Sequence, residues 1–278
     1  MPGYVDLHLH TTASDGVLTP AQLLDEVRSK ELVAFSIADH DTLDGYREVS
    51  GLLTDTDPEL VPGLELSVTT DDGDMHMLAY LFDPDHDELA SALVRFCKER
   101  NQRGHRMVER LNEQGLDLTF DAVVQAAAGA AVGRPHIAEV MLAEGLVSSF
   151  EEAFHKYIGN RCPAYIPKSR IGPKETIDLI HRAQGVAVLA HPFINDMHHH
   201  VEMLAGLCLD GLEVNHYSHS RQKVQELRSL AKRHGLLLSG GSDFHGRQEH
   251  EGEIGADQVP VEYLDKLKDR AQEIRGTC

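Results

Sequence analysis

The side chains that could do chemistry in this chain are mainly histidines and carboxylates spread along most of its length. His8 and His10 lie two residues apart in VDLHLH, so in a strand both imidazoles point to the same face. Two imidazoles on one face can chelate a metal ion, but such a pair can equally be hydrogen-bonded core residues. The pair therefore indicates a metal site only if other potential ligands lie close to it.

Further ligand types follow the ends of the other predicted strands. They are Asp15 in ASDG, His40 in ADHD, Glu65 in GLELS, His76 in DMHML, His191 in LAHP, and Asp243 and His245 in SDFH. Functional side chains of a barrel gather at the face where its strands end, so we expect these residues to meet there. Imidazole and carboxylate without thiolate suit Zn²⁺, Mn²⁺ or Fe²⁺ and do not choose among them.

Hydrophobic periodicity indicates which elements must position these residues. From residue 5 to about 80, and again from about 175 to 245, short apolar runs alternate with helical patterns, which is typical of an α/β fold. From about 86 to 158 the pattern is wholly helical. We therefore expect residues 1–85 and 165–278 to form one metal-binding barrel, and residues 86–164 to form an inserted helical subdomain that caps the site.

Composition excludes several classes of function. The net charge is −19, which disfavours docking on duplex nucleic acid. No run approaches the ~20 apolar residues of a membrane helix, and the N-terminus does not read as a signal peptide, so we expect a cytoplasmic protein without a membrane partner. The four cysteines are scattered without a CxxC pair, which argues against a disulfide framework. The oligomeric state is left open.

The ordered motifs DLHLH, SDG, ADHDT, GLELS, MHM, AHP and SDFH resemble those of the polymerase and histidinol phosphatase (PHP) family, over about residues 6–245. The resemblance implies a distorted seven-stranded (β/α) barrel around two or three divalent metal ions, Mn, Zn or Fe. It implies one ion on His8, His10, Glu65 and Asp243, a second on Glu65, His76 and His191, and a third on Asp15, His40 and His245. One departure is Ala38, where many members have threonine.

The helical insertion resembles that of the nucleotide phosphatase branch of the family. Members of that branch remove the 3′-phosphate of nucleoside 3′,5′-bisphosphates, and some trim short RNA from its 5′ end. In GRPHIAEVM, Arg134 and His136 are candidates to bind a second phosphate, because a guanidinium can bind phosphate bidentately. The alternative is that GRPH only begins a helix, with Pro135 in the first turn. Lys168 and Arg170, in YIPKSRIGP, are further substrate-binding candidates or members of a solvated loop.

These expectations define a mechanism. Ions sharing Glu65 would lower the pKa of a bridging water, so that hydroxide attacks phosphorus in a small phosphorylated substrate. The leaving oxygen would take its proton from His191, His245, His219 or a water. A histidine bound to metal is a poor acid, which favours water or His219, a residue near a strand end that is also expected at the pocket rim. Asp39 and Asp41 flank His40 and are interpreted as supports of the ligands.

The competing hypotheses keep the metal centre but assign it a different substrate or no catalytic role. Histidinol phosphate, or a cyclic ribose phosphate opened as a diester, would be handled by the same centre without need of Arg134. A non-catalytic, metal-binding regulatory module is the alternative from another class, and the complete ligand set argues against it. A related amidohydrolase would use a carbamylated lysine that has no counterpart at these strand ends.

Overall fold

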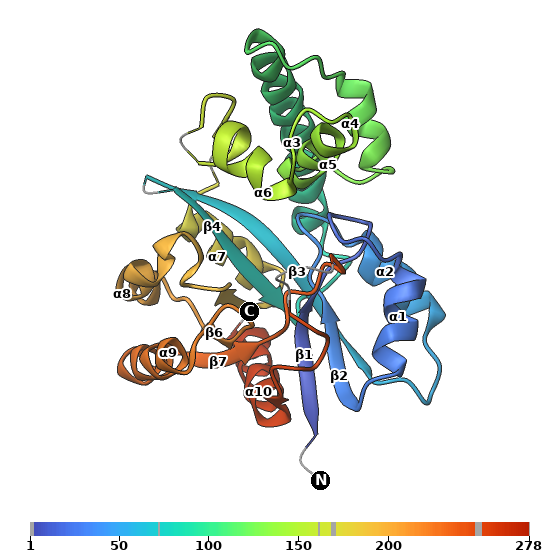
Figure 1. Ribbon diagram of the computed structural model, residues 1–278. Coiled ribbons are helices and arrows are strands. Elements are labelled where there is room, and N and C mark those ends of the chain that lie inside the picture. The colour runs from blue at the N-terminus through green and yellow to red at the C-terminus, as the bar shows by residue number, and fades with distance from the viewer. Residues whose placement is uncertain (1–2, 72, 161, 168–170, 248–251, 278) are drawn as a thin grey trace.

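The strands form one mixed sheet that curves into a nearly closed barrel (Figure 1). The computed structural model describes residues 3–71, 73–160, 162–167, 171–247 and 252–277. Its strands are β1 (Tyr4–Leu9), β2 (Leu32–Ile37), β3 (Glu59–Thr70), β4 (Gly73–Tyr80), β5 (Val186–Leu189), β6 (Gly211–Asn215), β7 (Leu237–Gly240) and β8 (Val259–Pro260). Within the described residues their order is β7-β6-β5-β4-β3-β2-β1-β8. The chain is therefore an α/β protein, as expected.

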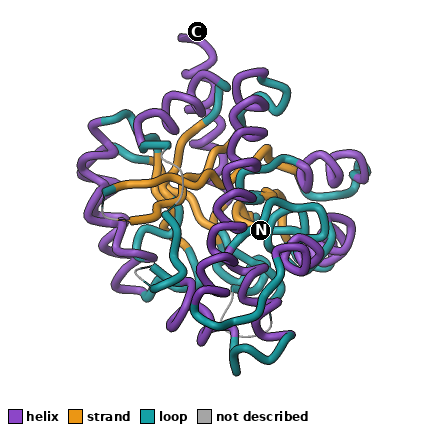
Figure 2. Tube along the Cα trace, turned by 90° about the horizontal axis from the view of Figure 1, so that it is seen from above, coloured by secondary structure: helices purple, strands orange, loops and turns teal. Residues whose placement is uncertain are grey.

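Two contacts at β1 nearly close the barrel and correct the expected strand number from seven to eight. A parallel bridge between Leu9 and Phe244 brings the chain after β7 back to the end of β1. The additional strand, β8, has two residues and pairs antiparallel with the start of β1, where Tyr4 lies opposite Pro260. A pairing this short leaves no alternation in the sequence to detect, which is why it was missed. Figure 2 shows the strands in the centre with helices around them.

Helices cover the outside of the barrel. They are α1 (Pro20–Arg28), α2 (Asp44–Leu52), α7 (Pro173–Arg182), α8 (Val201–Gly206), α9 (Arg221–His234) and α10 (Val261–Thr277), with a 3₁₀ helix at Ile194–His200. The start of α1 is encoded locally, because Thr19 and Gln22 form a capping box around Pro20. Leu264 and Leu267 of α10 join the core cluster that contains Val5 and Leu7 of β1. α10 therefore packs near the start of the barrel, away from the ligand-bearing end of β1.

The segment between β4 and α7 forms a separate group of helices above the barrel (Figure 1). They are α3 (Asp87–Glu113), α4 (Phe120–Ala126), α5 (Arg134–Ala143), α6 (Phe150–Ala153) and a π-helical turn, Phe154–Ile158. Met107 and Leu111 of α3 pack with Ile137 and Met141 of α5 in a core of their own. Such a core is what an inserted subdomain requires, and the bounds 86–164 stay a prediction.

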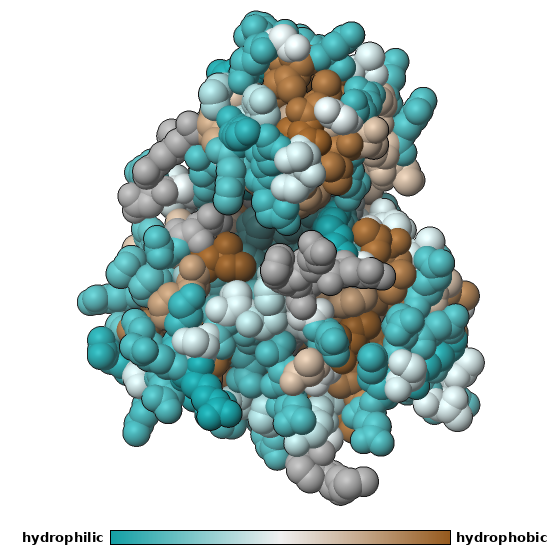
Figure 3. Space-filling model, in the orientation of Figure 1, coloured by the Kyte–Doolittle hydropathy of each residue, from teal (hydrophilic) through white to brown (hydrophobic). Residues whose placement is uncertain are grey.

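Helix α3 connects the helical group to the barrel through two cores. Leu89 and Phe96, in its first half, belong to the barrel core, whereas Met107 and Leu111, in its second half, belong to the insertion core. The surface is hollowed between the helical group and the strands below it (Figure 3). Helix α3, which contributes to both cores, therefore holds the insertion over the end of the barrel.

Among the helices of the described residues, none is both long and apolar enough to cross a membrane.

Candidate metal centre

All nine predicted metal ligands lie in one connected cluster at the end of the barrel. The cluster centres on Glu65 of β3, whose side chain is almost completely buried. Its Oε2 lies 3.4 Å from Nε2 of His8, 3.4 Å from Nε2 of His10 and 3.0 Å from Nδ1 of His40. Its Oε1 lies 2.9 Å from Nδ1 of His76 and 2.9 Å from Nε2 of His191. The two carboxylate oxygens thus face two different sets of imidazoles.

One set of ligand atoms gathers around Oε2 of Glu65 and Asp243. Asp243 Oδ1 lies 3.3 Å from Nε2 of His8 and 3.1 Å from Nε2 of His10, and one ligand atom from each of these four residues fits within 4.8 Å. Neither Nε2 has a hydrogen-bond partner of acceptable geometry among the described residues, although both are buried. Unpaired buried nitrogens are costly, so this donor set fits a cation. The same four residues were predicted to share one ion.

A second set lies around Asp15. Its Oδ1 is 3.4 Å from Nε2 of His245, and its Oδ2 is 3.8 Å from Nε2 of His40. His10 also joins this set within 4.8 Å, its Nδ1 lying 3.9 Å from Asp15. The sequence predicted the other three residues. His10 joins them because the loop directly after it turns back on itself, with the backbone N–H groups of Ser14 and Gly16 both donating to the carbonyl oxygen of Thr11.

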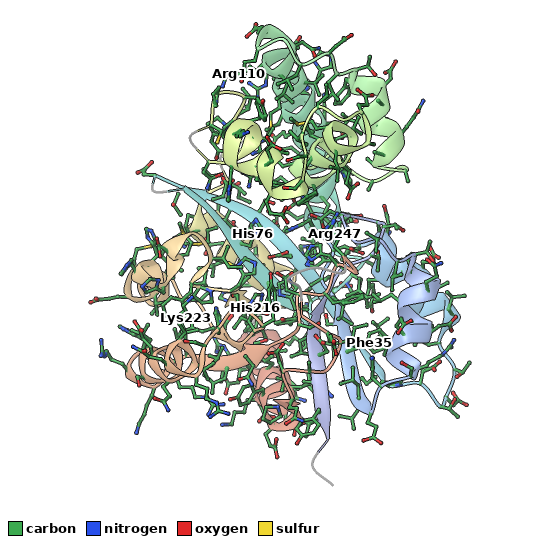
Figure 4. All side chains as sticks on the ribbon, in the orientation of Figure 1. Phe35, His76, Arg110, His216, Lys223 and Arg247 are labelled. Carbon is green, nitrogen blue, oxygen red and sulfur yellow. The ribbon has the colours of Figure 1, made fainter. Side chains whose placement is uncertain are left out.

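The third set forms around Oε1 of Glu65. His76 and His191 both reach this oxygen, and their rings meet edge to face with centroids 5.2 Å apart. A three-residue cluster of His40, Glu65 and His76 also fits within 4.8 Å. Figure 4 shows His76 near the upper end of the sheet, beneath the helical group. The structure therefore places the residues predicted for the second ion together, with His40 beside them.

Unusual backbone conformations aim two of these ligands inward. His191 follows β5 with φ +24°, and Asp243 follows β7 with φ +52°. Non-glycine residues seldom adopt positive φ, and such strain persists only where surrounding contacts hold it. One such contact is from the backbone N–H of His191, which donates to Oε2 of Glu213 at 2.6 Å. The contact with Glu213 thus helps to hold the strained turn after β5 that carries His191.

Glu213 of β6 is a site residue that was not predicted from the sequence. Its side chain is fully buried, and its Oε1 accepts from Nδ1 of His8 at 2.8 Å. A carboxylate at Nδ1 keeps that nitrogen protonated and leaves the Nε2 lone pair for a metal ion. An acidic residue between the apolar neighbours of GLEV was the signal that could have identified it.

Asp39 and Asp41 support the centre from outside it. Asp39 accepts from the backbone N–H and hydroxyl of Thr11, both at 2.7 Å, and from Ser14 Oγ at 2.6 Å, which orders the loop that carries Asp15. Asp41 accepts from the backbone N–H of Ser67 at 2.9 Å and from Arg100 at 2.8 Å. These contacts connect the loop after β2 to β3 and to α3.

The electrostatics of the centre reflect its packed opposite charges. Burial lowers the pKa of His8, but the carboxylates of Glu213, Asp243 and Glu65 outweigh it and raise that pKa well above its ordinary value. Burial raises the pKa of Glu65, but the neighbouring histidines, His40 first, bring it well below its usual range. The carboxylates are therefore ionised and ready to bind cations.

The residues that were predicted to bind substrate differ in their positions and contacts in the structure. Helix α5 begins at Arg134 with Pro135 in its first turn, and His136 Nδ1 accepts from the backbone N–H of Gly133 at 3.0 Å. GRPH therefore does begin a helix. Arg134 also reaches β4, its Nη2 lying 3.4 Å from Oδ2 of Asp74. Lys168 and Arg170 lie outside the described residues.

His219 lies beside the centre in a defined orientation. Its Nδ1 is 3.0 Å from the carbonyl oxygen of Val214, to which only a protonated Nδ1 can donate. Burial lowers its pKa to about 4, so the ring is neutral near pH 7 and its Nε2 carries a lone pair. Nearby His216 approaches the centre directly, its Nε2 lying 3.3 Å from Asp243 Oδ2. His219 is thus suited to accept a proton or hydrogen bond rather than to donate one.

A barrel that collects histidines and carboxylates at its strand ends, around a shared carboxylate, defines a metal-dependent enzyme of the α/β class. Comparison with known proteins identifies its family. The chain is 32% identical over 254 residues to the 5′-3′ exoribonuclease Rnm of Escherichia coli, covering 86% of this chain and 84% of that protein. It is 29% identical to the 3′,5′-nucleoside bisphosphate phosphatase of Chromobacterium violaceum, covering 90% of each.

A solved structure agrees with these relatives. A Bifidobacterium adolescentis protein, described as a metal-dependent phosphoesterase, superposes with a TM-score of 0.87 at 31% identity, over 97% of this chain and 98% of that one. No family model matches the chain. The chain belongs to the PHP family of metal-dependent phosphoesterases, and its enzymatic class is phosphoric ester hydrolase.

Proposed function

We propose that this enzyme removes the 3′-phosphate from nucleoside 3′,5′-bisphosphates. The observation that carries the proposal is the position of Arg134 on the insertion, paired with Asp74 two residues before His76 on β4. Residues two apart in a strand share a face, so a guanidinium stands beside the metal centre. A substrate with two phosphates can present one to the metal ions and the other to this arginine.

The ligand assignment follows the predicted one. His8, His10, Glu65 and Asp243 would hold one ion, Glu65, His76 and His191 a second, and Asp15, His40 and His245 a third. When bound, divalent ions supply positive charge to the phosphate oxygens and lower the pKa of a coordinated water. The protein contributes fixed geometry, because Glu213, Asp39 and the left-handed turns hold the donors in place before substrate arrives.

Substrate handling is assigned to the insertion and to the loops near it. Arg134 would bind the phosphate that is not hydrolysed, while His136 holds the first turn of α5 and so orients Arg134. Lys168 and Arg170 remain candidates from their sequence position. The leaving ribose oxygen would take its proton from water. His191 and His245 are assigned as metal ligands and would be poor acids, and Nε2 of His219 has no proton to give.

Short RNA with a 5′-phosphate is a second candidate substrate, favoured by the similarity to the exoribonuclease. Its first nucleotide presents the same two groups as a 3′,5′-bisphosphate, a 5′-phosphate and a 3′-linked phosphorus. The difference is only that the 3′-phosphorus carries a second nucleoside. The net charge of −19 would repel longer strands, which limits this activity to short ones.

The test is turnover by the Mn²⁺-loaded enzyme of adenosine 3′,5′-bisphosphate, AMP, histidinol phosphate, a cyclic ribose phosphate and a 5′-phosphorylated RNA dinucleotide. We expect the bisphosphate to be the best substrate. Arg134→Ala should lower kcat/KM for it roughly 10- to 100-fold, and His76→Ala should abolish activity on every ester. Preference for histidinol phosphate or the cyclic ester, with no effect of Arg134→Ala, would refute the proposal. Metal binding without turnover would indicate a regulatory module.

A further inference from the structure

His216, directly after β6, is a buried histidine at the metal centre that the proposed function does not use. It is 2% exposed, and its ring meets that of His191 edge to face with centroids 5.5 Å apart. Figure 4 shows it below His76. Strand β6 carries none of the nine predicted metal ligands, but it carries Glu213, which accepts a hydrogen bond from His8. The end of β6 therefore lies among the predicted ligands without supplying one of them.

The position of the proton on the His216 ring follows from its contacts with Ser218. The backbone N–H of Ser218 donates to Nδ1 of His216 at 3.2 Å, and the Ser218 hydroxyl lies 2.8 Å from the same nitrogen. A backbone N–H can only donate, so Nδ1 carries a lone pair and the proton of the neutral ring is on Nε2. An imidazolium, with a proton on each nitrogen, would set two N–H groups against each other. The turn after β6 therefore selects the neutral tautomer with a protonated Nε2.

This protonated nitrogen faces one oxygen of the predicted ligand Asp243. Nε2 of His216 donates to Oδ2 of Asp243 over 3.3 Å. The other oxygen, Oδ1, lies 3.3 Å from Nε2 of His8 and 3.1 Å from Nε2 of His10. A nitrogen that carries a proton has no lone pair for a metal ion, so His216 is placed to support a ligand and not to be one. The two oxygens of Asp243 thus have separate partners.

Asp243 needs such support because of its backbone. It has a φ of +52°, a conformation that a non-glycine residue keeps only where surrounding contacts hold it. The preceding residue is held as well, since the backbone N–H of Ser242 donates to Oδ1 of Asp6 at 3.0 Å. The hydrogen bond from His216 fixes the side chain of Asp243 as the contact of Ser242 fixes its backbone.

We propose that His216 is a positioning residue, which turns Asp243 so that Oδ1 faces the ion it is assigned to share with His8 and His10. Hydrogen bonds to the ligands of a metal ion orient them and contribute to its affinity. Strand β6 then supports this ion through two ligands, His8 by way of Glu213 and Asp243 by way of His216. The inference rests on the ligand assignment in the proposed function and does not depend on the substrate.

The experiment compares two substitutions that keep an amide donor but differ in reach. The amide nitrogen of glutamine can take the place of imidazole Nε2 and donate to Asp243, whereas that of asparagine reaches only to the place of Nδ1. Mn²⁺ content per chain, and Mn²⁺ affinity in competition with a chelator, are measured for the wild type, His216→Gln and His216→Asn. Exposed His155→Gln is the matched control. We expect His216→Asn to lower the affinity for one ion roughly 10- to 100-fold, and His216→Gln to stay close to the wild type.

The visible absorption of the Co²⁺-loaded enzyme is a readout that a purely structural role would not move. His216→Asn should change the spectrum, because Asp243 is then oriented differently at the ion, and His216→Gln should keep the wild-type spectrum. Equal affinity and equal spectra in all three proteins would overturn the inference. An equal loss in both variants would overturn it too, because it would show that the imidazole itself is required as a metal ligand or for packing.

The tautomer provides a test that does not need His216→Asn to fold. In the Zn²⁺-loaded wild type, NMR correlations between the ring nitrogens and carbon-bound hydrogens of His216 should show the proton on Nε2, with the signals identified by their loss in His216→Gln. A proton on Nδ1 would overturn the inference. A wild type that binds no Mn²⁺ would overturn the ligand assignment and this inference with it. A wild type that binds Mn²⁺ without hydrolysing the bisphosphate would overturn the proposed substrate, and the affinities of the His216 variants would still decide this inference.

Discussion

Glu213 accepts a hydrogen bond from His8 over 2.8 Å, between two side chains that are both fully buried. The second oxygen of the same carboxylate accepts from the backbone N–H of His191. One residue of β6 therefore holds a ligand on β1 and the turn that carries another ligand after β5. This contact sets the side of the His8 ring that faces the centre.

Glu213→Gln should weaken metal binding without unfolding the protein. Glutamine keeps the shape but has one acceptor oxygen where glutamate has two, so either His8 or the turn at His191 loses its partner. Loss of such a support typically lowers metal affinity roughly 10- to 100-fold. Metal content per chain and competition with a chelator measure the effect, with exposed Glu226→Gln as the control. Equal metal content in both variants would show that Glu213 is not a positioning residue.

Gly241→Ala should destabilise the barrel where β1 meets the chain after β7. A Cβ at Gly241 would overlap the backbone nitrogen of His8 and lie 2.9 Å from Asp6 Oδ1. Neither atom can move without disturbing β1, so we expect a loss of about 1–3 kcal/mol in the free energy of unfolding. Gly51→Ala is the control, since a Cβ on that residue of α2 meets nothing within 4 Å and should be neutral or stabilising. Denaturant unfolding compares them, and equal stabilities would contradict the prediction.

Removal of metal should lower the thermal stability of the enzyme. Cations that bind only the folded state would stabilise the buried, unpaired Nε2 atoms of His8 and His10 and the clustered carboxylates. We expect the unfolding temperature to fall on treatment with a chelator and to recover with Mn²⁺. Asp15→Ala should bind fewer ions per chain than the wild type, whereas exposed Asp55→Ala should bind the same number. An unfolding temperature indifferent to the chelator would argue against a resident metal.

Asp257 should make stability depend on pH. Burial first, and then the charges of Asp6 and Glu213, raise its pKa from 3.8 to about 6. The unfolded chain ionises more readily, so the folded state loses stability as pH rises from about 4 to about 6, and the loss is constant above that. Asp257→Asn should therefore gain about 1 kcal/mol at pH ~7.5, a value discounted for partial exposure, and much less at pH ~4. Unfolding at both pH values tests this, and a gain that is the same at both would rule out titration of Asp257 as its cause.

The local sequence pattern was sufficient to predict many of the residues of the candidate metal centre. The ligand types could be predicted from GLELS, LAHP and SDFH, and the expected place after a strand is confirmed for His191 and Asp243, because strand alternation and turn residues are properties of neighbouring positions. It was wrong for Glu65 and His76, which lie within β3 and β4. The long helical stretch likewise predicted α3, α4 and α5, since helical periodicity is also a local property. Arg134 could be singled out in GRPH, although its pairing with Asp74 could not.

Tertiary structure decided which residues meet. Glu213 lies 205 positions from His8 in the chain, and the register and curvature of the barrel bring them together. The same curvature places His10 near Asp243, and it allows the two residues of β8 to pair with β1. Such distances depend on long-range packing, which no pattern of neighbouring residues encodes.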